Sequence, residues 1–87
     1  MIKWRETSNR KHFESFELNT PGLRINITNG HILDPGTWML SCRELSISTF
    51  DLKAGSALVA KLNAVKEVRL RLMKMVNGLD EILKPEK

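Results

Sequence analysis

Hydrophobic and polar residues alternate with a period of two in the first half of the chain and recur at helical spacing in the second half. The clearest alternation covers residues 23–28, where Leu23, Ile25 and Ile27 share one face and polar residues share the other. Such alternation is typical of a strand with one face on a core and one face in water. Asn29-Gly30, which follows it, favours a tight turn.

Three further strands are predicted beside it, which makes four in all. The first covers residues 11–18 and leads into a turn at residues 19–22, where Pro and Gly supply the special backbone angles. The third carries Trp38, Leu40 and Cys42 on one face, and the fourth ends near Thr49. Because Leu45 and Ile47 fall on the opposite parity, we expect a bulge or a break near residues 43–44.

The spacing after residue 51 predicts one long amphipathic helix over residues 52–76, capped by Ser48, Thr49 or Asp51. Asn77-Gly78 is expected to end or kink it. The apolar stripe is wider than one small sheet can cover, so we expect a second copy to bury the remainder, helix against helix. The residues predicted to form this dimer interface are Leu58, Leu62, Val65, Arg69, Leu72, Val76 and Leu79.

These elements predict an α+β fold in two layers: a four-stranded antiparallel sheet followed by one long C-terminal helix, which together form a β-β-β-β-α domain over residues 11–83. Residues 1–10 are expected to form a basic N-terminal arm. Residues 84–87 are expected to be a frayed tail.

The charge composition of the chain indicates a class of binding partner. The chain of 87 residues holds 14 Lys and Arg against 10 Asp and Glu, a net charge of +4. This excess fits a polyanion such as nucleic acid, and it is equally typical of a small domain that needs charge for solubility.

The single cysteine, Cys42, excludes an intramolecular disulfide and favours a reducing compartment. No hydrophobic run approaches the length that spans a membrane, and the N-terminal segment lacks the apolar core of a signal peptide. We therefore expect a protein that is not secreted and has no membrane partner. Its expected location is the cytoplasm or the nucleus.

Catalytic patterns are absent from the sequence. His12 and His31 have no metal-ligand spacing with each other or with Cys42, which is interpreted as a small buried hydrophobe. No glycine-rich phosphate loop occurs. We expect no enzymatic activity, no cofactor and no metal, and therefore a protein that works by binding.

Single-strand binders combine a positive groove for phosphates with aromatic faces on which bases stack. Here basic residues gather around Trp4 in the arm and on the polar side of the predicted sheet. The predicted nucleic-acid-binding residues are Lys3, Trp4, Arg5, Arg10, Lys11, Phe13, Arg24, Asn26 and Arg43.

Three segments in this order, LRINI at residues 23–27, ILDPG at 32–36 and SISTFDL at 46–52, carry a family resemblance. They resemble the single-stranded DNA-binding domain of the transcriptional coactivator positive cofactor four and its bacterial and viral relatives, over about residues 11–83. The resemblance implies a homodimer whose helices pack across the two-fold axis. Its sheets would hold melted DNA with little sequence preference, in transcription, replication or recombination. The family's range implies the cytoplasm of a bacterium or of a virus-infected host cell, or the nucleus.

By position, Lys11 resembles the family's basic residue that opens the first strand, and Arg43 resembles the one that leads into the last strand. The chain departs from the family at three places. His31 and Ile32 stand where the family has a base-stacking tryptophan, the turn at residues 19–22 lacks the family's aromatic residue, and Glu44 stands where the family tends to have a lysine. Stacking would then come from Trp4, Phe13 or Trp38.

Two functions follow from these patterns and from the resemblance. The first is binding of single-stranded DNA or RNA by a homodimer, with replication or transcription proteins as further partners. The alternative is a protein-protein interaction module that uses the C-terminal amphipathic helix and binds no nucleic acid.

Overall fold

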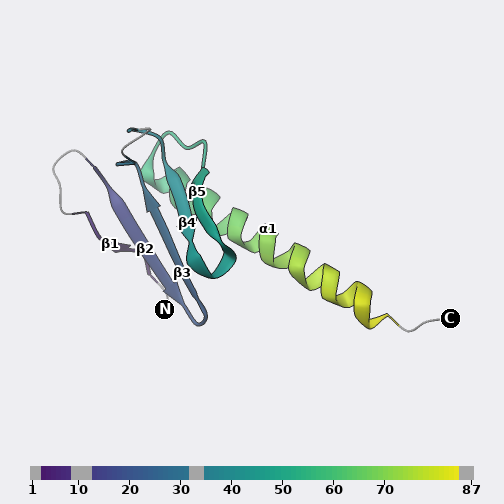
Figure 1. The fold of residues 1–87 in the computed structure, drawn as a ribbon. Helices are drawn as coiled ribbons and strands as arrows, with labels where there is room; N and C mark the ends of the chain where they lie inside the picture. The colour runs from purple at the N-terminus through teal and green to yellow at the C-terminus, as the bar shows by residue number, and fades with distance from the viewer. Residues whose placement is uncertain (1–2, 9–12, 32–34, 85–87) are drawn as a thin grey trace.

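The computed structural model describes residues 3–8, 13–31 and 35–84, and it has an α+β architecture (Figure 1). An antiparallel sheet with the strand order β1-β2-β3-β4-β5 is followed by one helix. Its elements are β1 (Arg5–Glu6), β2 (Ser15–Thr20), β3 (Leu23–Thr28), β4 (Met39–Cys42), the 3-10 turn η1 (Arg43–Leu45), β5 (Ile47–Asp51) and α1 (Ala57–Leu83). Each strand therefore pairs with its neighbour in sequence.

The sheet has five strands, so the prediction of four is wrong. The additional strand, β1, lies in the segment predicted to be an arm, where Arg5 pairs with Glu17 and Glu6 pairs with Phe16 of β2. Two residues are too few to show an alternation of period two, which is why the sequence pattern does not reveal this strand.

The turn between β2 and β3 is shorter than predicted. Asn19 and Thr20 belong to β2, where Thr20 pairs with Leu23, so only Pro21 and Gly22 form the loop. Gly22 has φ +84°, a left-handed conformation that suits a residue without a Cβ. The predicted start of this strand, residues 11–12, lies outside the described residues.

The predicted irregularity between the last two strands is confirmed. The pairing of β4 with β5 shifts register between Leu40 and Cys42, and η1 follows at once. Ser46 closes this turn in the left-handed conformation, with φ 57°. The residues of this turn bring the alternation of β5 back into phase with that of β4, so that Cys42 and Ile47 both face the core.

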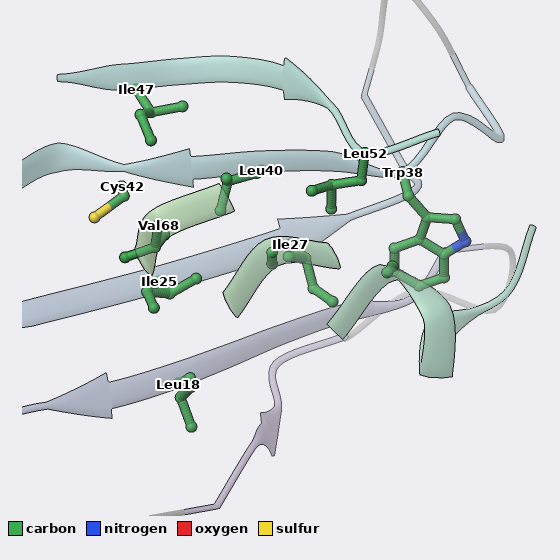
Figure 2. Packing of buried hydrophobic residues seen from close by; sticks show 11 residues of the cluster. Leu18, Ile25, Ile27, Trp38, Leu40, Cys42, Ile47, Leu52 and Val68 are labelled. Carbon is green, nitrogen blue, oxygen red and sulfur yellow. The ribbon is translucent and has the colours of Figure 1, made fainter. Parts of the chain in front are cut away.

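The core lies between one face of the sheet and the N-terminal half of α1 (Figure 2). From the sheet it takes Leu18, Ile25, Ile27, Trp38, Leu40, Cys42 and Ile47, followed by Leu52 in the connection to the helix. The helix contributes Ala60, Ala64 and Val68, which are at most 3% exposed. Because two of these three side chains are methyl groups, the helix backbone packs close to the strands.

The helix begins five residues later than predicted, at Ala57. Ser56 is its N-cap, and the Ser56 Oγ accepts a hydrogen bond from the Val59 backbone N–H at 3.3 Å. The predicted caps Ser48, Thr49 and Asp51 belong to β5 instead. Asp51 does cap a backbone group, since its carboxylate accepts from the Lys53 N–H at 2.8 Å, but this bond stabilises the connection rather than the helix.

The predicted end at Asn77-Gly78 is also wrong, because α1 continues without a break to Leu83. A glycine inside a helix costs about 1 kcal/mol relative to alanine, which the strong helix formers on both sides can offset. Of the predicted tail, Lys84 is described, and its Nζ lies 2.9 Å from the Glu81 carboxylate. Residues 85–87 lie outside the described residues.

The C-terminal half of α1 extends beyond the sheet (Figure 1). Its 27 residues give a helix of about 40 Å, and every described residue from Met73 onward is exposed. The radius of gyration is 15.3 Å, against about 12 Å expected for a compact chain of this length. No helix in the described ranges has the length and hydropathy needed to cross a membrane.

The core predicts the effect of a large-to-small substitution. Leu40 is fully buried, so Leu40→Ala leaves a cavity and should lower the free energy of unfolding by about 3 kcal/mol. The exposed Ser48→Ala in β5 should change it by less than about 0.5 kcal/mol. Urea unfolding followed by circular dichroism measures both, and equal stabilities for the two variants would contradict the core described here.

Candidate nucleic-acid interface

The side of the sheet that faces away from α1, called the outer face below, is mostly polar. The register places Glu17, Asn26 and Ser41 side by side across β2, β3 and β4. By alternation, the outer face carries Ser15, Glu17, Asn19, Arg24, Asn26, Thr28, Met39 and Ser41. The sheet thus has one apolar side covered by the helix and one polar side open to water.

Glu17 organises the first half of the outer face. Its carboxylate lies 2.8 Å from Arg5 Nη2 and 3.1 Å from Arg24 Nε, so one acidic group joins β1, β2 and β3. The hydrogen bond from the Arg5 guanidinium is the largest influence on Glu17 and holds the pKa of its carboxyl group below the ordinary value. Two arginines predicted to bind nucleic acid are therefore positioned by a shared carboxylate.

Glu44 supplies a hydrogen-bond acceptor to the backbone of β3 at the point where β4 ends. Its Oε1 accepts a hydrogen bond from the Arg24 backbone N–H at 2.8 Å, in place of a partner from the next strand. That N–H is the largest cause that lowers the pKa of the Glu44 carboxyl group, which is ionised at neutral pH. The Cys42 thiol also donates to Oε1 across 3.8 Å, and burial raises the pKa of this thiol. A buried, protonated thiol matches the prediction that Cys42 is a core residue.

Two arginines lie near the end of the β3–β4 ladder. The ladder ends at Asn26 and Ser41; beyond it Arg43 begins η1, and the Arg24 backbone N–H bonds to Glu44. Arg24 and Arg43 line one hollow there, and like charges that share a hollow repel each other. Glu17 balances Arg24, whereas the Arg43 side chain forms no ion pair within the described ranges. The arrangement leaves one guanidinium available to an anion.

Arg24, Asn26 and Arg43 line one hollow of about 350 Å³, together with Asn19, Thr20, Leu23 and Glu44. A second hollow of about 470 Å³ lies beside it, lined by Asn26, Ser41, Arg43, Ser46, Ile47 and Ser48. Because Asn26 and Arg43 line both, we treat the two hollows as one trough that runs from β2 to β5. Three of the predicted nucleic-acid-binding residues are thus brought together.

The other predicted residues lie apart from this trough. Lys3 is exposed just before β1, and Trp4 packs partly against the core rather than on the outer face. Phe13 is half-buried and lies over Gly30, where an added Cβ would come within 2.5 Å of the Phe13 Cγ. Arg10 and Lys11 lie outside the described residues.

Trp38 does not supply a face for a nucleic-acid base. It is 5% exposed, and its ring stacks on Phe16 with 6.3 Å between the centroids. This pair lies on the helix side, where Lys61 Nζ sits 4.0 Å from the centre of the Phe16 ring. Of the aromatic residues predicted to stack on bases, Phe13 is the one that remains near the outer face. The hydrogen bond from the Asn29 N–H to the Glu14 carbonyl extends the β2–β3 pairing as far as the residue next to Phe13.

Sequence reasoning missed several residues of the trough. Asn19 and Ser41 share the parity of Glu17 and Met39, so alternation could have placed them on the outer face. Ser46 could not have been found this way, because its position depends on the turn after Cys42. Within the described ranges, no three His, Cys, Asp or Glu residues group closely enough to hold a metal ion.

The ion pairs of Glu17 predict a pH dependence of stability. Because the pKa of Glu17 is lower in the folded chain than its ordinary value of 4.5, the stabilisation is present above pH 4.5 and is lost as the pH falls below it. Glu17→Gln should therefore unfold at a lower temperature than the wild type at pH 7, by a margin that shrinks toward pH 3.

Thermal unfolding followed by circular dichroism at pH 7 and pH 3 measures this margin. Glu14→Gln is the matched control, since Glu14 is exposed and its carboxylate forms no ion pair in the described part of the chain. A Glu17→Gln variant with the pH dependence of the wild type would contradict the role assigned to these ion pairs.

The outer face therefore gathers Arg24, Asn26 and Arg43 around one open trough, with Glu17 and Glu44 holding the strands that carry them. Donors and acceptors of this kind suit a ligand that is both anionic and rich in hydrogen-bonding groups. The family resemblance stays a prediction. Comparison of the chain with protein-family models, with curated proteins and with solved structures finds no match.

Proposed function

We propose that this protein binds single-stranded nucleic acid, single-stranded DNA first, along the outer face of its sheet and does so as a homodimer. The observation that carries the proposal is the trough on the outer face whose lining includes both Arg24 and Arg43. Such binding would support transcription, replication or recombination on melted DNA. The protein acts in this proposal as a binder and not as an enzyme.

The charges of the trough favour an anionic ligand. Arg43 is exposed and has no side-chain ion pair within the described ranges, and the side chain of Arg24 is 68% exposed although it contacts Glu17. A phosphate between the two guanidinium groups would relieve their repulsion, and arginine binds phosphate through two parallel hydrogen bonds. Asn19, Asn26 and Ser41 add neutral donors and acceptors for sugars and bases.

The shape of the trough favours a single strand over a duplex. Proteins that read duplex DNA place a helix or a two-stranded ribbon in the major groove. On the outer face, the trough is instead a shallow hollow across several strands, which a flexible strand can follow. Since aromatic side chains contribute little here, phosphate contacts would supply most of the affinity, and the affinity would depend steeply on salt.

Arg43→Ala tests the trough directly. The variant should bind a labelled mixed-sequence single-stranded 20-mer more weakly than the wild type, about equally for different sequences. The slope of log affinity against log salt should become shallower by about 0.7, the value for one phosphate contact on a single strand. Fluorescence anisotropy at several salt concentrations, with single-stranded and duplex DNA, measures both effects.

Lys74→Ala provides the matched control, because it removes the same charge from an exposed position on the projecting part of α1. It should leave affinity and slope near those of the wild type. Equal losses in the two variants would mean that net charge alone attracts DNA. Absence of binding at low salt would overturn the proposal.

The exposed stripe of α1 supports a homodimer as the binding form. Leu62, Val76 and Leu79 are 54%, 51% and 60% exposed, which is unusual for large apolar side chains along one helix. The charges favour a second copy of this helix as the partner. Arg69 and Asp80 lie 11 residues apart, about three helical turns, so they share a face with Val76. An antiparallel pair would bring each Arg69 next to the Asp80 of the other copy.

A charge exchange tests this pairing. Arg69→Asp should weaken the dimer, because it places two acidic groups together, and adding Asp80→Arg should restore the affinity by reversing the pair. Lys74→Asp makes the same charge change on the opposite side of the helix from Val76, since two residues turn the helix by about 200°, and it should have little effect. Sedimentation equilibrium measures the dissociation constants, and a double variant no tighter than Arg69→Asp alone would contradict the antiparallel pairing.

The same stripe supports a second candidate function, a protein-protein interaction module that binds no nucleic acid. The observation in its favour is the row of exposed apolar residues from Met73 to Leu83, which the sheet does not cover. The anisotropy experiment separates the two functions. A dimer or hetero-complex without DNA binding at low salt would favour the interaction module.

A further inference from the structure

An acidic residue such as Glu44 is not expected in the lining of a trough that binds only phosphates. It lines the same hollow as Arg24 and Arg43, and its ionised carboxylate repels a phosphate that approaches them. The Arg24 backbone N–H holds Oε1 at 2.8 Å, so the carboxylate is kept at the end of β3 and does not swing into bulk water. A fixed negative charge at this position needs a ligand group that benefits from it.

An ionised carboxylate accepts hydrogen bonds and donates none. Among the groups of a nucleic-acid strand, the exocyclic amines of cytosine, adenine and guanine are donors that fit it, and acidic side chains accept from the cytosine N4 amine. Thymine and uracil present a carbonyl oxygen at the corresponding position, which a carboxylate repels, and their one ring donor that is free in a strand, N3–H, lies between two such oxygens. Arg43 and Asn26 line the same hollow and can donate to the ring nitrogen and carbonyl oxygen of the same base.

We infer that Glu44 makes the trough discriminate between bases, with unpaired cytosine preferred over thymine. This inference rests on the proposed function and adds a specificity-determining residue to it. A single-strand binder that holds only phosphates would be indifferent to the base, whereas the juxtaposition of Glu44, Asn26 and Arg43 provides one acceptor and two sources of donors within one hollow.

Glu44→Gln separates this role from the structural one. The Gln carbonyl oxygen can still accept from the Arg24 N–H, so β3 stays capped, while the negative charge is replaced by an amide that can also donate. The variant should bind both (dC)20 and (dT)20 more tightly than the wild type, and (dT)20 should gain more. We expect the preference for (dC)20 over (dT)20 to fall by about fivefold, the effect of one discriminating base contact.

Asp51→Asn is the matched control. Asp51 is also an exposed acidic residue whose carboxylate caps a backbone N–H, that of Lys53 at 2.8 Å, but it does not line the trough. Its substitution should tighten binding to both homopolymers alike and leave their ratio unchanged. Arg43→Ala should weaken binding to both, which shows that the trough is the site being measured.

Anisotropy titrations with both labelled homopolymers at one salt concentration and pH 7.5 give the ratio for each variant. The inference is supported if the ratio changes in Glu44→Gln and not in Asp51→Asn. It is overturned if the ratio stays within twofold of the wild type in Glu44→Gln while Arg43→Ala still weakens binding, and the proposed function then survives. If the wild type binds neither homopolymer at low salt, the proposed function fails as well.

Discussion

The packing of α1 on the sheet through Ala60, Ala64 and Val68 decides which surfaces of this molecule remain available. These small side chains bring the helix close to the inner face of the sheet, so a short core of aliphatic residues and one tryptophan fills the space between the layers. The helix contacts the sheet and its core as far as Arg71, which lies over the Phe50 ring, and Leu72. The larger apolar side chains of α1 beyond this point stay outside the core, and among the described residues no further layer covers the outer face of the sheet.

Two carboxylates give the uncovered face its organisation. Glu17 bridges Arg5 and Arg24 across three strands, and Glu44 takes the place of a strand partner where β4 stops short of β3. Glu17 positions two guanidinium groups, Glu44 holds the Arg24 backbone, and each carboxylate reduces the positive charge of the face at the same time. The ligand that suits this arrangement is held by a few positioned contacts in addition to general charge attraction, which is the physical basis for expecting a preference among bases.

The two available surfaces lie on opposite sides of the sheet. A second copy that pairs with the apolar stripe of α1 would leave the outer face of each subunit open, so dimerisation and strand binding do not compete in the proposed function. Two troughs in one dimer would also raise the affinity for a strand long enough to reach both, because the second contact becomes intramolecular.

Local patterns in the sequence determined the α+β class, the strand Leu23–Thr28, the break near residues 43–44 and the burial of Cys42, because alternation and turn residues act over a few neighbours. They could not reveal β1, which exists only by pairing with β2, or the true start and end of α1. Nor could they show the contacts of the candidate site. The Arg5 guanidinium reaches Glu17 across 12 residues, and the Arg24 backbone N–H reaches Glu44 across 20, so only the tertiary structure brings these groups together.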